Sequence, residues 1–236
     1  MHLYPYIFKR RSTRRYDMTP LRESQLQDIR SFAKNMRPLF PAIRVEYRLD
    51  SNVRNILPVK APHNFIISSE LKEGYLENVG FLYQQMDLYL SSLGLGSCWL
   101  GMAKPSEAVD THLEFVIVLA FGKPKDNPYR GPEGFNRKAL GDIASGNDPR
   151  LEAVRLAPSA SNTQNWYFVC DGGEIHAYQK LLNPVKAKFY DRFNRLDVGI
   201  ALCHLYLATV EQGKDFNFTN EGMPELEGYR AIGTVG

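Results

Sequence analysis

Two long segments with helical periodicity, at about residues 75–93 and 195–212, constrain the fold of this chain more than any other feature. In each segment, apolar side chains recur on one face at the spacing of an α-helix. Both have a Val-Gly pair and a later closing glycine, Val79-Gly80 with Gly94 and Val198-Gly199 with Gly213, separated by 119 residues. The matched spacing favours an internal repeat, although two helices that end in glycine can also match by chance.

The other predicted elements lie around these two helices. Shorter helices are expected at about residues 20–34, where Thr19 caps the first turn and Pro20 lies in it, and at 149–156 after Asp148. Asp171-Gly172-Gly173 is typical of a hairpin turn. Strand-like runs occur at Ile43–Leu49, His63–Ser68, Glu114–Phe121, Trp166–Cys170, Glu174–Tyr178 and Tyr229–Val235.

The order of these features predicts one unit made of two half-repeats, at about 1–125 and 137–236. A connector rich in Gly and Pro, from Gly122 to Gly146, joins them. In this comparison Ala61-Pro62 matches Ala157-Pro158, and the strand with Phe65–Ile67 matches the strand with Tyr167–Val169. Each half then ends in a strand followed by glycine.

Composition excludes several classes of protein. Of 236 residues, 44% are hydrophobic and 23% are charged, close to the roughly 45–50% and 25% of globular domains, so the chain is not disordered. No run approaches the roughly 18 apolar residues of a membrane span, and the N-terminus does not resemble a secretory signal. Three cysteines leave one unpaired, which favours a reducing compartment and predicts a cytoplasmic location. A net charge of +3 is too small to indicate nucleic-acid binding.

Basic residues are concentrated between positions 9 and 15, where Ser12 and Thr13 interrupt five lysines and arginines. This segment has three interpretations: a solvated arm, an arm that contacts nucleic-acid phosphates, or a pocket for a single phosphate. Arginine forks bind phosphate with two parallel hydrogen bonds, and hydroxyls donate further ones. The chain has no second basic cluster of this density, so nucleic acid is the least favoured partner.

Standard motifs for nucleotide, metal and hydrolase chemistry are not met. Trp99 stands where a dinucleotide fingerprint needs its third glycine, and Met102 and Ala103 replace the Lys and Ser/Thr of a P-loop. The cysteines and histidines do not have metal-ligand spacing, and we expect Cys203 and His204 to be packing residues. No Gly-x-Ser-x-Gly nucleophile motif is present.

The stretch from Arg155 to Trp166 combines a helix end, a proline and several small hydrogen-bonding side chains. Asn and Gln side chains carry both donors and acceptors, so such a loop can bind the edge of a heteroaromatic ring. Taken alone, it can equally be an elaborate turn.

Together these segments resemble the FMN-dependent nitroreductase family. Arg10–Arg14 is similar to its N-terminal Arg-Arg-Ser-x-Arg motif, and Arg155–Trp166 to its Ala-Pro-Ser-x-x-Asn-x-Gln-Pro-Trp loop. Gly94–Gly101 resembles its Gly-Leu-Gly-x-x-Trp-x-Gly segment, and Val116–Pro124 the strand and turn that follow. The loop lies about 145 residues after the arginine motif, whereas family members usually have it soon after, and Asn165 replaces the usual proline.

The resemblance implies an α+β sandwich with a mostly antiparallel central sheet flanked by helices. It implies FMN as cofactor, NAD(P)H as reductant, and nitroaromatics or quinones as acceptors, with no catalytic side chain and no metal. Members are homodimers with FMN at the interface, so fused halves imply one FMN per chain and a monomer, with an internal pseudo-two-fold, or a weak homodimer. A storage or sensing protein without turnover is the alternative.

The implied site residues fall into two groups. The FMN phosphate would be held by the N-terminal arginine motif, with Arg137 or Lys138 as a weaker candidate from the connector. The isoalloxazine would contact the loop and the Leu100–Met102 segment. The candidates are Arg10, Arg11, Ser12, Arg14, Leu100, Gly101, Arg137, Pro158, Ser159, Ala160, Asn162 and Gln164.

Overall fold

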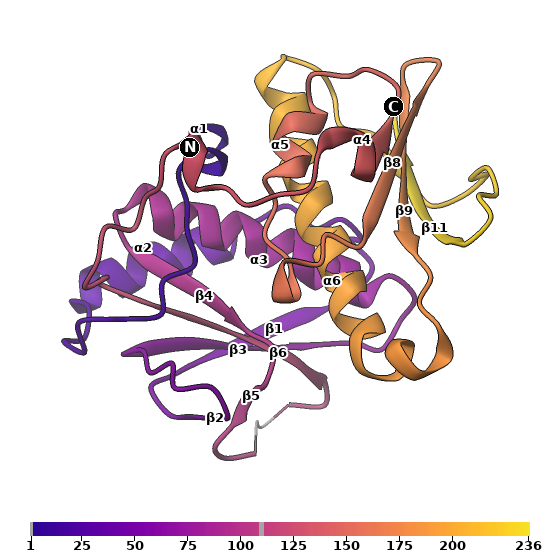
Figure 1. The fold of residues 1–236 in the computed structure, drawn as a ribbon. Coiled ribbons are helices and arrows are strands. Elements are labelled where there is room, and N and C mark those ends of the chain that lie inside the picture. The colour runs from indigo at the N-terminus through magenta and orange to yellow at the C-terminus, as the bar shows by residue number, and fades with distance from the viewer. Residues whose placement is uncertain (1, 109–110) are drawn as a thin grey trace.

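Two sheets and two long helices between them form most of the fold (Figure 1). The computed structural model describes residues 2–108 and 111–236. Its helices are α1 (Tyr4–Ile7), α2 (Glu23–Ala33), α3 (Tyr75–Ser92), α4 (Leu140–Ile143), α5 (Leu151–Arg155) and α6 (Pro184–Glu211), with 3-10 turns at Pro132–Gly134 and Ala160–Asn162. Its strands are β1 (Val45–Asp50), β2 (Val53–Asn55), β3 (His63–Ser69), β4 (Gly96–Leu100), β5 (Ala103–Pro105), β6 (Glu114–Gly122), β7 (Ala144–Ser145), β8 (Trp166–Asp171), β9 (Glu174–Lys180), β10 (Phe218–Thr219) and β11 (Tyr229–Val235).

The sheets are almost entirely antiparallel, which confirms the predicted α+β class. One sheet has the order β1-β3-β6-β4 and the other β10-β11-β9-β8-β7, while β2 and β5 form a separate pair. The pairing of β7 with β8 is parallel. The strands thus form two main sheets, whereas the resemblance implied a single central sheet.

Both sheets follow the same strand order along the chain. If β7 is set aside, the first strand of each sheet pairs with the second, the second with the fourth, and the fourth with the third. The long helix connects the second strand to the third in both, α3 between β3 and β4 and α6 between β9 and β10. This correspondence is the one an internal pseudo-two-fold requires, and duplication of one ancestral half stays a prediction.

The strand order corrects how the two halves were matched. The sequence comparison matched the strand with Phe65–Ile67 to the strand with Tyr167–Val169. By position in the sheets, β3 instead corresponds to β9, and β8 corresponds to β1. Pro158 precedes β8, so its counterpart is Pro38, which precedes β1, and not Pro62.

The centre of the molecule is the crossing of α3 and α6 (Figure 1). A Cβ on Gly80 would lie 2.0 Å from the carbonyl oxygen of Leu196, and a Cβ on Gly199 would lie 2.0 Å from that of Glu77. The two contacts are reciprocal, because the same 119-residue shift relates both pairs. The Val-Gly pairs therefore mark the point where the two helix backbones meet.

Helix α3 is buried from Leu76 to Ser91, so it carries polar side chains into the core. Helix α6 begins at Pro184 and not near residue 195, because Asn183 caps it: its Oδ1 accepts the Lys186 N–H at 2.9 Å. None of the helices in the described part of the chain is long and apolar enough to cross a membrane.

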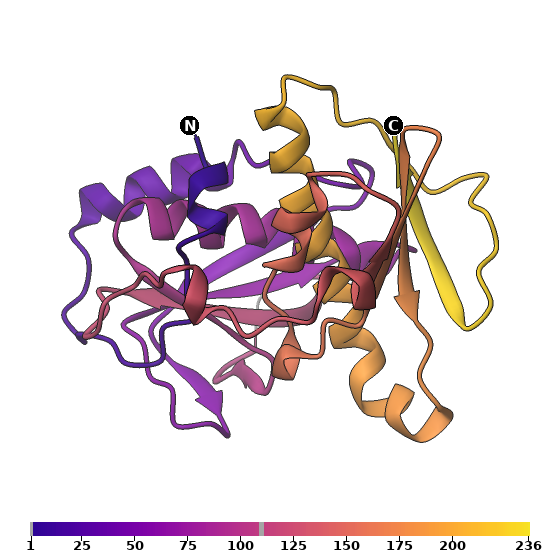
Figure 2. The same cartoon turned by 45° about the horizontal axis from the view of Figure 1, so that its top comes forward.

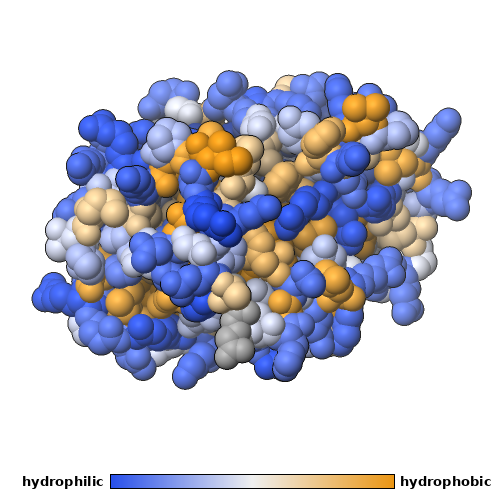
Figure 3. Space-filling model, turned by 90° about the horizontal axis from the view of Figure 1, so that it is seen from below, coloured by the Kyte–Doolittle hydropathy of each residue, from blue (hydrophilic) through white to orange (hydrophobic). Residues whose placement is uncertain are grey.

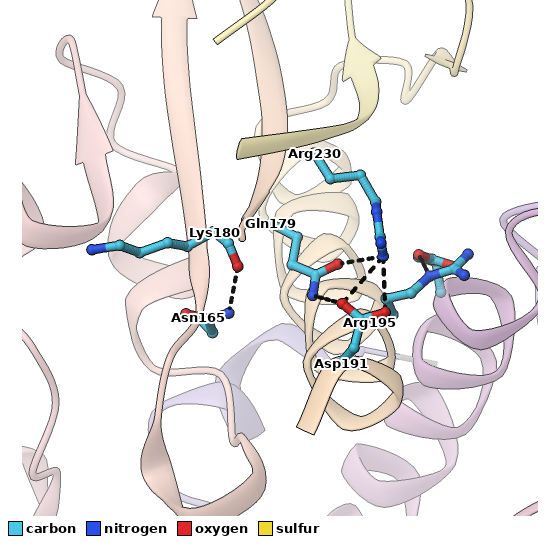
Figure 4. A network of polar contacts seen from close by, with 7 residues as sticks. Asn165, Gln179, Lys180, Asp191, Arg195 and Arg230 are labelled. Carbon is cyan, nitrogen blue, oxygen red and sulfur yellow. Dashed lines mark hydrogen bonds and ion pairs between the residues drawn. The ribbon is translucent and has the colours of Figure 1, made fainter. Parts of the chain in front are cut away.

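The start of α6 is held to the second sheet by a polar network (Figure 4). Gln179 of β9 donates to Asp191 at 2.8 Å, and Arg230 of β11 contacts both side chains. One turn further along α6, Arg195 pairs with Glu77 of α3 through two hydrogen bonds, 2.6 and 2.9 Å long. These contacts fix the angle at which α6 leaves the sheet.

The predicted helix at 20–34 begins later than expected. Thr19 is not its cap, because the Thr19 hydroxyl donates to Asp17 and the helix starts at Glu23. The segment before it runs extended beside the connector (Figure 2). Arg10 forms a β-bridge with Tyr129, and Tyr16 forms one with Pro124. Part of the predicted connector is therefore structured against the N-terminus.

Replacing Gly80 with Ala is expected to destabilise the protein, because the added methyl overlaps a backbone carbonyl that side-chain rotation cannot move. Overpacking of this kind costs about 1–3 kcal/mol. The control is Gly141→Ala, where a Cβ would meet nothing within 4 Å. Urea denaturation measures both changes; equal stability of the two variants would show that the helices do not meet at Gly80.

Candidate active site

The N-terminal arginine segment lies along β4 in an extended conformation. Ser12 bridges Ser97, and the Thr13 N–H donates to the Ser97 carbonyl at 2.9 Å. A Cβ on Gly96 would lie 2.3 Å from the Thr13 hydroxyl, so this glycine allows the close approach. The sequence alone did not predict β4, because the strand is short and begins at a glycine, which weakens the apolar pattern of a strand.

Arg10 is buried and is the inner end of a polar network. It is 1% exposed, and its Nε lies 2.8 Å from Asp87 Oδ2 of α3. Gln84 donates to Asp87 at 3.1 Å and lies 3.0 Å from Nε2 of His204 on α6. The network thus links the N-terminal segment to both central helices.

His204 is neutral in this network. Burial, with smaller contributions from the positive charges of Arg10 and Arg137, lowers the pKa of His204 to about 3. A neutral ring fits its partners if Nδ1 donates to the Ala153 carbonyl, 2.8 Å away, and Nε2 accepts from Gln84. His204 is thus a satisfied packing residue, as the sequence indicated.

Four guanidinium groups form what we call the arginine cluster: those of Arg10, Arg11, Arg130 and Arg137. Arg130 donates to the Arg10 carbonyl at 2.9 Å. Burial and then the charge of Arg10 lower the pKa of both Arg130 and Arg137 to about 10. The negative charge of Asp87 opposes the lowered pKa of Arg130.

Two donors of the arginine cluster have no partner in the described structure. Arg10 Nη1 and Arg137 Nε are buried and make no hydrogen bond there. Leaving a buried donor of a charged group unpaired costs several kcal/mol, so natural sites rarely keep one without a ligand. Excess positive charge and unpaired donors together fit a bound anion such as a phosphate.

The loop from Ser159 to Gln164, here named the strained loop, has an unusual backbone. Ser161, Asn162 and Gln164 have φ values of 50°, 56° and 44°, and no other non-glycine residue in the described ranges has a positive φ. Left-handed backbone at a residue other than glycine costs about 1–3 kcal/mol and is concentrated at ligand and active sites.

The connector holds the strained loop in place. Arg137 donates to the Asn162 side chain at 2.6 Å, and the backbone N–H of Lys138 donates to the Gln164 side chain at 2.8 Å. Asn162 in turn donates to the Asn136 carbonyl at 2.8 Å. The structure therefore brings Arg137, Asn162 and Gln164 together, three residues that the sequence placed in one site.

Asn165, at the end of the loop, replaces the proline expected from the resemblance. Its side chain donates to the Lys180 carbonyl at 2.8 Å, and the Lys180 N–H donates to the Asn165 carbonyl at 3.2 Å (Figure 4). Two hydrogen bonds to β9 thus fix the start of β8.

The end of β4 reaches the same turn of α6 as the strained loop. A Cβ on Gly101 would lie 2.9 Å from the Phe193 ring, and Thr163 contacts Asn194 at 3.5 Å. Leu100 is buried, whereas Gly101 is exposed. The end of β4 and the strained loop thus contact neighbouring residues of α6.

The remaining candidate residues make fewer contacts with the arginine cluster and the strained loop. Arg11 and Arg14 are exposed. The positive charge of Arg11 contributes to the lowered pKa of Arg130. Ser12 accepts from Arg10 at 3.2 Å, and Pro158 is buried at the start of the loop. The sequence missed Arg130, whose only signal was a basic side chain in a segment taken for a linker.

Replacing Asp87 with Asn is expected to destabilise the protein strongly, because the buried Arg10 guanidinium loses its counter-charge. Breaking one side of a buried ion pair costs about 3–5 kcal/mol. Asp126→Asn is the control, since it breaks a surface pair with Arg15 and should change stability little. Thermal unfolding of both variants decides; similar midpoints would contradict a structural role for the buried pair.

Known proteins share this architecture. The family model described as "Putative TM nitroreductase" matches residues 2–209. A "putative nitroreductase" from Thermotoga maritima is 21% identical, with a TM-score of 0.71 over 100% of this chain and 93% of that one, which shows a shared fold.

Two further structures are similar over part of the chain. An FMN-dependent nitroreductase from Clostridium difficile is 17% identical over 58% of this chain and 97% of that one, at a TM-score of 0.45. Iodotyrosine deiodinase, solved with FMN and 3-iodo-L-tyrosine, is 19% identical over 58% of this chain and 95% of that one, at a TM-score of 0.42. No curated protein matches. The family model covers most of the chain, and the protein belongs to the nitroreductase family.

Proposed function

We propose that this protein is an FMN-dependent oxidoreductase that uses NAD(P)H to reduce nitroaromatic or quinone-like acceptors by ping-pong hydride transfer. The proposal rests mainly on the arginine cluster and the strained loop beside it. The cluster has an excess of positive charge, and the loop backbone is strained, as is common at ligand sites. The family and its FMN-dependent neighbour support the same cofactor.

The phosphate of FMN would lie against the arginine cluster. Arg10 Nη1 and Arg137 Nε are the unpaired buried donors there, and Arg11, Ser12 and Arg14 extend the donor set along the segment. A phosphate would offset the repulsion that lowers the pKa of Arg130 and Arg137. Charge-assisted hydrogen bonds of this kind are about twice as strong as neutral ones.

The isoalloxazine ring would lie between the strained loop and the end of β4. The residues proposed to contact it are Leu100, Gly101, Pro158, Ser159, Ala160, Asn162 and Gln164. Asn162 and Gln164 already bond to the connector, so their role is to hold the loop. Small residues at Ser159 and Ala160 let backbone groups approach the ring closely.

When bound, FMN would supply the redox chemistry, hydride transfer from NAD(P)H to the acceptor. The protein binds and orients both partners. Large apolar side chains are exposed at the start of α6, including Val185 at 74% and Phe189 at 64%. Phe189 lies one helical turn before Phe193, which packs against Gly101, so an aromatic acceptor has an apolar approach to the ring.

Figure 3 shows that apolar side chains also reach the lower face of the molecule, where hydrophilic ones separate them. The patches there are not continuous, which is the pattern of a surface in contact with water. We propose a cytoplasmic protein with small-molecule substrates, working as a monomer or a weak homodimer.

One FMN per chain is proposed because the pseudo-symmetric counterpart of the site is filled. The 119-residue shift relates Phe193 to Gly74. The Phe40 ring packs against Gly74 so closely that a Cβ on Gly74 would lie 2.6 Å from the ring. The Glu77–Arg195 ion pair lies in the same place. The cavity left there is about 220 Å³, smaller than the roughly 300–1,000 Å³ of most ligand sites.

Oxidation of NADPH by the FMN-loaded protein in the presence of a quinone tests the activity. We expect turnover with a quinone and little NADPH oxidation without one under anaerobic conditions. A protein that binds FMN but gives no turnover with any quinone or nitroaromatic would support storage or sensing instead.

Replacing Arg11 with Glu is expected to weaken FMN binding by about 100-fold, because it removes a charge-assisted hydrogen bond and adds repulsion. Arg15→Glu is the matched control, as Arg15 lies in the same segment but pairs with Asp126. Quenching of flavin fluorescence measures both affinities. Equal affinities in the two variants would refute the phosphate assignment.

A further inference from the structure

A buried acid on α6 holds the strained loop. Asp197 is 3% exposed, and its Oδ2 accepts the backbone N–H of Ala160 at 2.9 Å. This contact lies directly before Ser161 and Asn162, where the backbone is left-handed. The hydrogen bond from Ala160 to Asp197 therefore holds the loop next to its strained residues.

The other half of the molecule has the same contact with a different side chain. The 119-residue shift relates Asp197 to Asn78 of α3, and Asn78 Oδ1 accepts the N–H groups of Leu39 and Phe40, both at 2.9 Å. Those residues follow Pro38, as Ser159 and Ala160 follow Pro158. An amide performs this task without ever ionising, whereas the site half uses a titratable group.

The surroundings of Asp197 disfavour its charged form. Burial raises the pKa of Asp197 to about 8, and the Ala160 hydrogen bond opposes this in part. No charged group of the described chain contributes to the shift.

The nearby charges have partners of their own. Glu77 of α3 pairs with Arg195, and Arg192 of α6 donates to the Val116 carbonyl of β6. Arg137 bonds to the side chain of Asn162, and the Lys138 N–H bonds to that of Gln164. The buried carboxyl thus has one N–H to stabilise a negative charge and no counter-ion, so ionisation favours opening of the loop toward water.

We propose that Asp197 is a proton-dependent clamp: its neutral carboxyl holds the strained loop in the conformation that binds the flavin ring, and its ionisation releases the loop. Asp197 is a positioning residue, since it acts through Ala160. The inference rests on the proposed function for its consequence, loss of flavin at high pH, but the clamp itself is a property of the protein without FMN.

The sign of the pH effect follows from the direction of the shift. The folded protein retains a proton on Asp197 that the unfolded chain, with a pKa of about 3.9, has already lost. Stability therefore falls as pH rises from about 4 to about 8 and levels off above, once both states are ionised. Asp197→Asn removes this contribution because an amide does not ionise, while its oxygen can still accept the Ala160 N–H.

Flavin fluorescence titration at pH 6.5 and pH 9 tests the consequence. Between these values the wild-type affinity should fall about tenfold more than that of Asp197→Asn, since about one Asp197 in ten stays neutral one unit above its pKa. Titration of FMN itself affects both proteins equally. Equal pH dependence in the two proteins would overturn the proposal.

Hydrogen exchange of the loop without FMN tests the clamp by itself. Exchange at Ser161 to Thr163 should accelerate between pH 6.5 and 9 in the wild type beyond the intrinsic increase, but not in Asp197→Asn. Asp197→Ala removes the acceptor, so exchange should be fast relative to the intrinsic rate at both pH values. Protection that is the same in all three proteins would contradict the clamp.

Asn78→Asp is the matched control, because it places an acid at the counterpart loop. It should make exchange at Leu39 and Phe40 depend on pH while the pH profile of FMN affinity stays that of the wild type. If no variant binds FMN at any pH, the proposed function fails, and the exchange data still decide whether the clamp exists.

Discussion

The crossing of α3 and α6 is the constraint on which the rest of the structure depends. Two glycines bring the helix backbones into contact, each against the carbonyl of the other helix. Because the contact is reciprocal, the two sheets are placed around it in the same strand order. The crossing also fixes where the polar side chains of both helices meet, so the geometry of the candidate site follows from it.

From this crossing, buried polar groups extend outward in two directions. His204, Gln84 and Asp87 lead to Arg10 and the arginine cluster, where positive charge exceeds negative charge. Asp197 leads to the strained loop. If FMN binds as proposed, its phosphate end and its ring end would both be supported from this helix pair. Such rigid support is what a preorganised site needs, because the loop backbone stores strain that packing must offset.

The sequence predicted the elements with strong periodicity and the residues with local motifs. The helix at 75–93 and the strand at 229–235 lie where expected. Arg137 bonds to Asn162 and Lys138 to Gln164, a contact between the connector and the loop that the sequence did not specify. The α+β class and the family are confirmed. The individual site residues stay predictions.

What the sequence did not predict depends on contacts between distant segments. Arg130 lies in a connector that has no pattern of its own and becomes part of a site only beside Arg10. Asp87 and Asp197 are acids inside buried helices, and periodicity places such a residue on a face without naming its partner. The halves were matched wrongly at Pro62 because Ala-Pro occurs before two different strands, and only strand order distinguishes them.

The number of FMN molecules bound per chain is the sharpest test of a single flavin site formed by both halves. Purified protein saturated with FMN and freed of excess cofactor would be measured by flavin absorbance against protein concentration, with the mass of the same sample in solution. A single site per chain predicts a ratio near one, retained in the monomer. A ratio near two, or FMN retained only in an obligate homodimer, would contradict it, as would a protein that binds none.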